Sequence, residues 1–207
     1  MGAEMGKKIV LGILGAIVLL VIVIGLSISG MYNSLVRLDQ ATQGQWAQVQ
    51  NAYQRRADLI PNLVATVKGA ANFEQGTMTA VTEARAKVGQ VTSGALENIA
   101  RDPAAFQRFQ QAQDGLSSAL SRLLVVSENY PDLKATANFR DLQAQLEGTE
   151  NRITVERQRF NDAARDFNTR RQGFPTVLIA GFFGDRFAVK PYFQSQTGAE
   201  KPPEVKF

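Results

Sequence analysis

Charged residues recur at helical spacing in two stretches of this sequence, and their types are the ones that could do chemistry. The two groups are Arg55, Arg56 and Asp58 in the first stretch, and Glu147, Glu150 and Arg152 in the second. Paired carboxylates beside arginine can act as a general acid and base, or bind an anion. The same side chains can instead form ion pairs that fix the alignment of helices in a bundle.

The rest of the sequence favours the structural interpretation of these charges. The chain contains no cysteine and no histidine, which excludes thiolate catalysis, Cys/His zinc sites, haem ligation and imidazole acid–base chemistry. No nucleophile, glycine-rich phosphate loop or metal-ligand spacing accompanies the charged pairs. We therefore expect a protein that is not an enzyme and holds no cofactor or metal. Because exposed ion pairs contribute only ~0–1 kcal/mol, a role in helix alignment requires partial burial.

Length and charge limit the remaining classes. With 207 residues, the chain has room for one membrane segment and one globular domain. The net charge of +4 is modest, and no run of Lys and Arg with interleaved aromatic residues is present. We therefore expect no nucleic-acid partner.

An uncharged apolar run predicts a transmembrane helix over residues 9–29, behind a short flank of residues 1–8. At 1.5 Å per residue, the run from Ile9 to Ile28 spans roughly the ~30 Å hydrocarbon core of a bilayer. A cleaved signal peptide is the alternative, but its apolar part is usually ~7–15 residues long, and no A-x-A-like site follows here. We expect a retained single-pass anchor that contacts membrane lipid. Lys7 and Lys8 outnumber Arg37 on the other flank, which places the following domain on the extracytoplasmic side of the cell membrane.

After Gly30 the apolar pattern becomes periodic and predicts a helix with a partly polar seam. Its seam positions are Leu35, Leu38, Thr42, Gln45, Val49, Ala52, Arg56, Leu59 and Leu63. No Gly-Pro turn separates this helix from the anchor, so one rod is expected to leave the bilayer, with Gly30 as its only candidate hinge. Pro61 removes a backbone donor and is expected to kink or break the helix, either as a structural kink or as a functional hinge.

Two more helices complete the pattern of a bundle. Asp102-Pro103 is a start signal for the first of them, and Pro131 ends it. The seams are Phe106, Phe109, Gln113, Leu116, Leu120, Leu123, Ser127 and Tyr130, then Phe139, Leu142, Leu146, Thr149, Ile153, Glu156, Phe160, Ala163 and Phe167. Residues 71–88 carry a weaker pattern, which either forms a fourth helix or continues the first. We expect an all-α protein: a transmembrane helix, then an antiparallel bundle of three to four long helices over residues 30–173.

The C-terminal segment, residues 174–207, differs in chemistry. It is rich in aromatic residues, including Phe182 and Phe183, and is interrupted by Gly and Pro. We expect an irregular segment that packs on its own bundle, touches lipid headgroups or binds a neighbouring subunit. The last residues, with Pro202-Pro203, are expected to be loose.

The stretches 53–64, 128–135 and 146–153 resemble, in this order, three motifs of the LemA family of bacterial membrane-anchored proteins. Besides the charged residues above, these stretches contain Pro61, Glu128, Tyr130, Pro131 and Asn151. The resemblance covers residues 32–193 and implies an N-terminal anchor with an antiparallel α-helical bundle. The resemblance implies no catalytic residues. The short N-terminus of the family is often placed outside the cell, opposite to the side that the charge count favours here.

Two functions follow as expectations. The first is a structural or scaffolding protein that self-associates, through its seams and aromatic tail, into a membrane-bound oligomer. The alternative is a binding module or signalling adaptor that presents one face of the bundle to another membrane protein.

Overall fold

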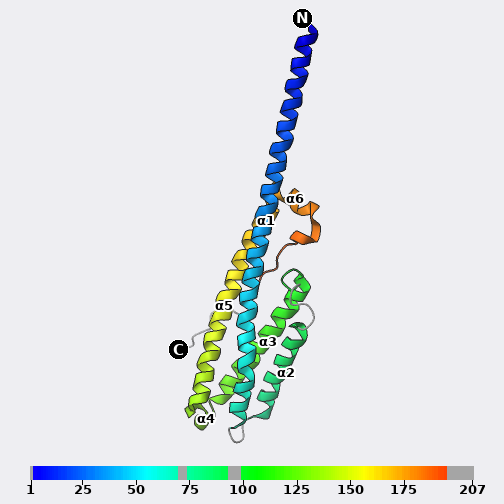
Figure 1. The fold of residues 1–207 in the computed structure, drawn as a ribbon. Coiled ribbons are helices and arrows are strands. Elements are labelled where there is room, and N and C mark those ends of the chain that lie inside the picture. Colours follow the sequence, from blue (N-terminus) through cyan, green and yellow to red (C-terminus); the bar gives the residue numbers. More distant parts are fainter. Residues whose placement is uncertain (1, 70–73, 93–98, 195–207) are drawn as a thin grey trace, which may run out of the picture.

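The computed structural model describes residues 2–69, 74–92 and 99–194, and the chain is helical throughout these ranges except in short connections (Figure 1). The elements are α1 (Gly2–Lys68), α2 (Gln75–Thr92), α3 (Pro103–Ser127), α4 (Pro131–Ala135), α5 (Ala137–Gln172), α6 (Thr176–Phe182) and the 3-10 helix η1 (Gly184–Phe187). No strand occurs in these described ranges. The predicted all-α class is confirmed.

Helix α1 runs as one helix of 67 residues from the apolar segment into the bundle. From Leu11 onward it contains an 18-residue window with a mean hydropathy of 3.0, and none of that window is buried in the protein. A helix of this length and composition can cross a membrane, as a cleaved signal sequence also could. The apolar part projects beyond the bundle in Figure 1, which is consistent with a membrane anchor. The helix is uninterrupted at Gly30.

The predicted break at Pro61 is wrong, because α1 continues through it to Lys68. Proline has no N–H to donate to the carbonyl of Ala57, four residues earlier. That carbonyl instead accepts a hydrogen bond from Nε of Arg85 on α2, at 3.3 Å. The helix is therefore not broken at Pro61, and the backbone carbonyl that Pro61 leaves without a donor becomes a contact for the neighbouring helix.

The bundle has four long helices arranged as two antiparallel pairs (Figure 1). Helix α1 packs closely along α5, and α2 packs closely along α3. The weaker pattern in residues 71–88 therefore belongs to a separate fourth helix, α2. Asp102 caps α3 by accepting from the backbone N–H of Ala104 at 2.9 Å, as its sequence signal predicted.

The seams predicted from the sequence lie inside a single chain. Along α3, every predicted position from Phe106 to Ser127 is buried. On α5 the seam is buried from Phe139 to Phe167 except at Leu142 and Ala163, which are half-buried. These stripes are used within one molecule, so self-association through them is not available.

The C-terminal segment is more ordered than predicted. It forms α6 and η1, joined at Gly184, whose φ of 54° is one that other residues rarely adopt. Ala180 and Phe187 pack with Leu35 and Phe167 at the end of the bundle from which the anchor projects. The chain then extends along the bundle to Phe193, which is buried among the core rings. The predicted loose tail after residue 194 lies outside the described residues.

Candidate functional site

Arg56 is the centre of the most buried polar cluster on α1. Its side chain is 1% exposed. Nη1 donates to Oε1 of Glu150 on α5 and to the hydroxyl of Ser117 on α3, both at 2.6 Å. Nη2 donates to the side-chain oxygen of Gln113 at 2.5 Å and to its carbonyl at 3.3 Å. One guanidinium thus ties together three of the four long helices.

A second cluster lies one turn away and is built around Tyr53, which is 5% exposed. Its hydroxyl accepts a hydrogen bond from Nε of Arg157, and Nη2 of Arg157 pairs with Asp114 at 2.8 Å. Burial raises the pKa of Tyr53 to about 12, although Arg157 and Arg56 act to lower it. The phenol therefore stays neutral near neutral pH, where it can accept from Arg157 but is not a base.

The raised pKa of Tyr53 predicts an alkaline loss of stability. In the unfolded chain the phenol ionises near pH 10, and in the folded chain only near pH 12. Between these values the unfolded state binds fewer protons, so the free energy of unfolding should fall as pH rises from about 10 to about 12. Chemical denaturation at pH 9 and pH 11 measures this fall. It should shrink in Tyr53→Phe, and an equal fall in both proteins would contradict the assignment.

A third cluster joins α1 to the C-terminal segment. Nζ of Lys190, which is 2% exposed, lies 2.5 Å from Oδ1 of Asp39. Arg101, just before α3, lies 3.6 Å from the other oxygen of Asp39. The ring of Phe167 lies 4.9 Å from the Lys190 ammonium. Two cations thus share one carboxylate, and the pair between Lys190 and Asp39 holds the tail against α1.

The polar residues of these clusters bind mainly one another, although the buried Nε of Arg56 has no hydrogen-bond partner among the described residues. Within the described ranges, no group of three or more His, Cys, Asp or Glu side chains is placed to hold a metal ion. Two of the candidate residues, Arg56 and Glu150, are brought together at 2.6 Å. Their geometry fits the role of fixing helix alignment.

The other charged residues of the two stretches do not join this pair. Arg55 and Asp58 are exposed on α1, and Asp58 accepts only from Gln54, at 2.7 Å. Glu147 is exposed and accepts from Gln143 at 3.1 Å. Each points away from the interior because it lies outside the seam of its helix. Of these six residues, only Arg56 and Glu150 are paired with each other.

The remaining motif residues have local roles. Arg152 is exposed and lies 3.9 Å from buried Glu156. Asn151 is exposed on α5. Tyr130 and Pro131 begin the short helix α4, and Pro131 takes the first helical position, where its missing N–H costs nothing.

Glu128 and the two tail phenylalanines lie at the surface. Glu128 pairs with Lys134 across the turn between α3 and α4. Phe183 is 39% exposed and packs against Tyr32 at 4.9 Å between ring centroids. Phe182 is 86% exposed.

The sequence alone did not single out the residues that hold the tail. Asn168 is 4% exposed. Its side-chain amide N–H donates to the carbonyl of Lys190 at 2.9 Å, and its side-chain oxygen accepts from the backbone N–H of Lys190 at 2.8 Å. Asn161 makes the same two bonds with Phe193, at 2.9 and 2.8 Å.

Removing the Asn168 amide should loosen the tail without unfolding the bundle. Asn168→Ala deletes two backbone hydrogen bonds, each of net worth ~0.5–1.5 kcal/mol. The backbone N–H of Lys190 should then exchange with solvent about 10- to 100-fold faster. Hydrogen–deuterium exchange measures this rate, with Asn151→Ala, an exposed position on the same helix, as the matched control. Unchanged exchange at Lys190 would show that these bonds do not hold the tail.

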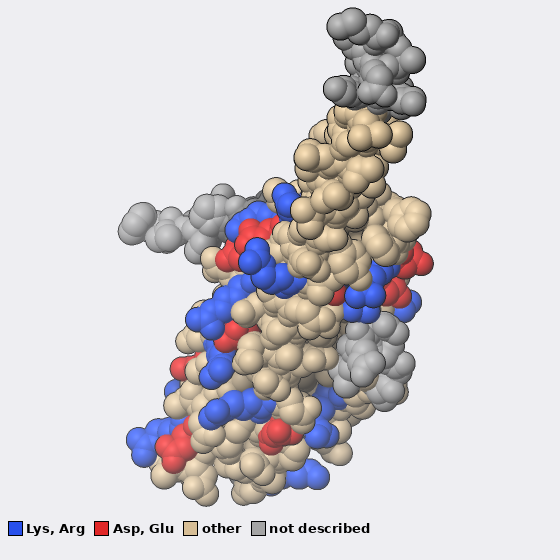
Figure 2. Space-filling view, turned by 45° about the horizontal axis from the view of Figure 1, so that its top comes forward, with Lys and Arg blue, Asp and Glu red and all other residues tan. Residues whose placement is uncertain are grey.

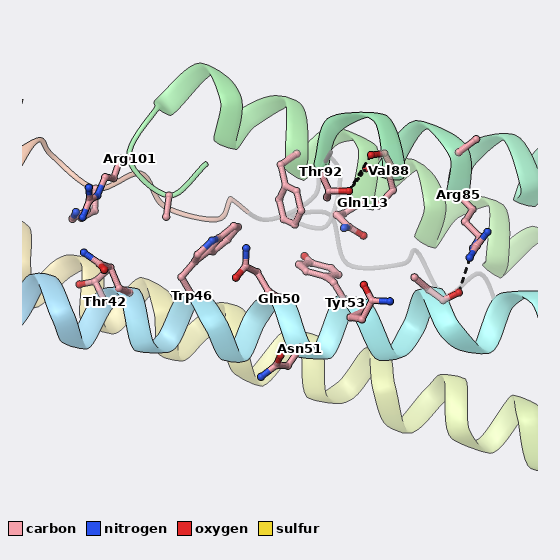
Figure 3. Close-up of a pocket in the computed structure, with 18 residues that line it drawn as sticks. Thr42, Trp46, Gln50, Asn51, Tyr53, Arg85, Val88, Thr92, Arg101 and Gln113 are labelled. Atoms are coloured by element: carbon pink, nitrogen blue, oxygen red, sulfur yellow. Dashed lines mark hydrogen bonds between the residues drawn. The ribbon is translucent and has the colours of Figure 1, made fainter. Parts of the chain in front are cut away.

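A cleft of about 850 Å³ opens between α1 and the α2/α3 pair (Figure 3). Its lining includes Trp46, Gln50, Tyr53 and three cations, Arg85, Arg101 and Lys190. None of the described residues that line it is acidic. The cleft is therefore amide-rich, aromatic and basic.

Comparison with known proteins agrees with this architecture. The family model described as "LemA family" matches residues 45–207. Magnetosome protein MamQ 2 of Paramagnetospirillum magneticum is 25% identical over 185 residues, which cover 83% of this chain and 67% of that protein. Magnetosome protein MamQ of Magnetospirillum gryphiswaldense is 24% identical over the same shares. Protein LemA of Metamycoplasma hominis is 26% identical over 151 residues, 73% of this chain and 64% of that protein. Since the family model covers more than half of its length, the chain belongs to the LemA family.

Proposed function

We propose that this protein is a membrane-anchored structural component that self-associates in the plane of the membrane and acts as a scaffold. The observation that supports it most is the continuity of α1 from the apolar segment into the bundle. A single continuous helix fixes the distance of the bundle from the apolar segment and its orientation relative to that segment, whereas a flexible linker would leave both free. Assembly of many copies into a scaffold needs a bundle that is held in such a fixed geometry.

The interior polar groups support a role without catalysis or cofactor. Arg56, Tyr53 and Lys190 are each buried, and each binds partners from another segment of the same chain. Such clusters resist rearrangement, which suits a rigid component. The named magnetosome relatives are titled after a cellular structure rather than a reaction, which fits this proposal.

Because the seams are buried within one chain, self-association falls to the anchor helix and the outer faces of the bundle. Contacts between anchors in a bilayer depend on close van der Waals packing. We further propose, from the basic residues Lys7 and Lys8, that the bundle lies on the extracytoplasmic side of the cell membrane and that no nucleic acid binds it.

Crosslinking in native membranes tests self-association. The chain has no cysteine, so Val155→Cys, at a position 47% exposed on the outer face of α5, provides a single reactive thiol. A bis-maleimide should give a covalent dimer, because each chain then offers one thiol. Mass photometry after gentle extraction should show the dimer and any larger assembly. A monomer in both measurements would reject the proposal.

The cleft supports a second candidate, an adaptor that binds a segment of another membrane protein. Its volume and lining would accept an extended chain whose amides pair with Gln50 and whose acidic side chains meet Arg85. This function predicts one stoichiometric partner on affinity purification from membranes, lost in Arg85→Glu. Retention of the same partner by that variant would exclude the cleft as its binding place.

A further inference from the structure

Helix α6 carries an apolar stripe that no part of the described chain covers. Phe174, Leu178 and Phe182 are 84%, 65% and 86% exposed. Leu178 and Phe182 are four residues apart, so they share one side of the helix, and Phe174 lies in the turn just before it. The opposite side is held by the buried residues Thr176 and Ala180. The bundle thus fixes α6 in a way that turns its most apolar side outward.

The position of α6 along α1 places this stripe relative to the bilayer. Tyr32 of α1 contacts Phe183 and Phe187, at 4.9 and 5.6 Å between ring centroids. Tyr32 lies four residues after Ile28, the end of the apolar run, and therefore ~6 Å beyond it at 1.5 Å per residue. The headgroup region on each side of the hydrocarbon core is ~5–7 Å deep. Tyr32 and its partners are therefore at headgroup level when the apolar run fills the core.

The two structural views agree with this placement. Figure 1 shows α6 beside α1 at the end of the bundle from which the apolar part projects. Figure 2 shows uncharged surface along that projecting part, while charged side chains gather over the bundle. The exposed guanidinium of Arg186 lies 5.5 Å from the ring of Tyr32. Aromatic rings and an arginine at this depth are typical of a membrane interface.

We propose that the stripe formed by Phe174, Leu178 and Phe182 inserts into the interfacial region of the same bilayer that α1 spans. It gives the protein a second membrane contact beside the anchor. Two contacts separated across the end of the bundle fix its tilt, which one helix passing through the bilayer does not do alone. The proposal depends on membrane anchoring and is independent of self-association.

Spin labels attached to single cysteines test the insertion. Leu178→Cys and Phe182→Cys place a nitroxide on the stripe of the full-length, otherwise cysteine-free chain. Val125→Cys is the matched control, because it replaces an aliphatic side chain that is 69% exposed near the opposite end of the bundle. Each protein is reconstituted at one copy per lipid nanodisc. The ratio of collisions with oxygen, which partitions into lipid, to those with a water-soluble nickel chelate should be several-fold higher on the stripe than at Val125.

Equal ratios at the three positions would overturn the proposal, since the stripe would then face water. In a second preparation, discs that hold two copies are compared with the single-copy discs. If a label on the stripe is shielded from both relaxants only in the two-copy discs, a second chain covers the stripe, and this result would also overturn the proposal. Crosslinking through Val155 reports self-association separately. A monomeric protein with a lipid-exposed stripe would therefore reject the scaffold and keep this inference.

Discussion

Arg56→Met is expected to lower the free energy of unfolding by about 3 kcal/mol. Removing one partner of a buried ion pair costs ~3–5 kcal/mol. The lower end applies here, because Glu150 is 39% exposed and can turn toward water. Gln113, by contrast, is 2% exposed, and its side-chain oxygen would lose the donor at 2.5 Å. An unsatisfied buried acceptor costs ~1–3 kcal/mol. Denaturant titration followed by circular dichroism measures the change.

The neighbour Arg55 supplies the control for charge and helix propensity. It is exposed on the same turn, so Arg55→Met should change stability by less than ~0.5 kcal/mol. Glu150→Gln on the Arg56→Met background should cost less than it does alone, since its partner is already gone. Equal costs for Arg55→Met and Arg56→Met would show that the cluster does not hold the three helices together.

Much of this architecture follows from periodicity alone. Steps of three and four residues placed Arg56 and Gln113 in seams among apolar residues, and both are buried. A polar residue in a buried seam needs a hydrogen-bond partner, so a buried polar cluster follows from the helical spacing of the sequence. The same rule separates Arg56 from Arg55, which lies outside the seam and is exposed. Grouping charged residues by motif, by contrast, does not tell which of the six candidates are buried.

Other features have no local signal. Asp39 and Lys190 are far apart in the sequence, and only the return of the tail along the bundle brings them together. The course of α1 through Pro61 depends on Arg85, a residue of another helix. The order of the C-terminal segment depends likewise on Asn168, whose backbone partner is at Lys190. Tertiary packing fixes long-range pairs of this kind, and short-range propensity does not predict them.

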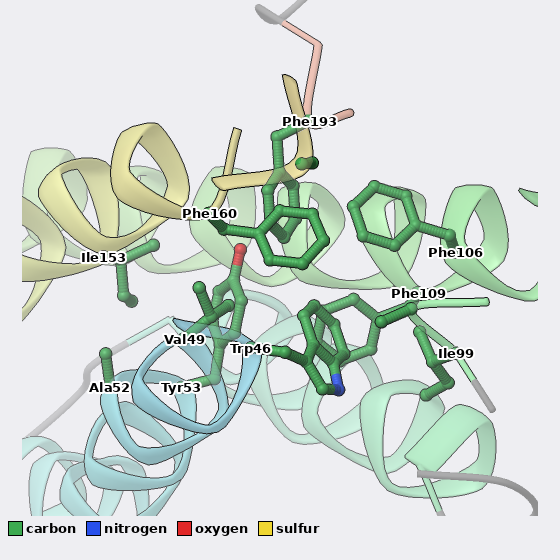
Figure 4. Close-up of a cluster of buried hydrophobic side chains, with 12 residues drawn as sticks. Trp46, Val49, Ala52, Tyr53, Ile99, Phe106, Phe109, Ile153, Phe160 and Phe193 are labelled. Carbon is green, nitrogen blue, oxygen red and sulfur yellow. The ribbon is translucent and has the colours of Figure 1, made fainter. Parts of the chain in front are cut away.

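Phe160→Ala is expected to cost the bundle ~3–5 kcal/mol, the usual range for removing a buried aromatic ring. Phe160 is 0% exposed. It lies at the point where α1, α3, α5 and the tail meet (Figure 4). Its ring centroid is 5.5 Å from Trp46, 5.7 Å from Phe106 and 5.6 Å from Phe193. A cavity here removes contacts from four segments at once, and no single segment can close it.

Trp46 is the only tryptophan of the chain and reports on this cavity directly. In Phe160→Ala its fluorescence emission should shift to longer wavelength, since water or mobile side chains replace the packed ring. Phe182→Ala is the matched control: the same atoms are removed from a side chain that is 86% exposed, so the stability in detergent should change by less than ~0.5 kcal/mol. If both variants unfold at the same denaturant concentration as the parent protein, the ring cluster does not provide the bundle's main cohesion. The rigid connection between the apolar part of α1 and the bundle would then depend on the contact between α1 and α5 alone.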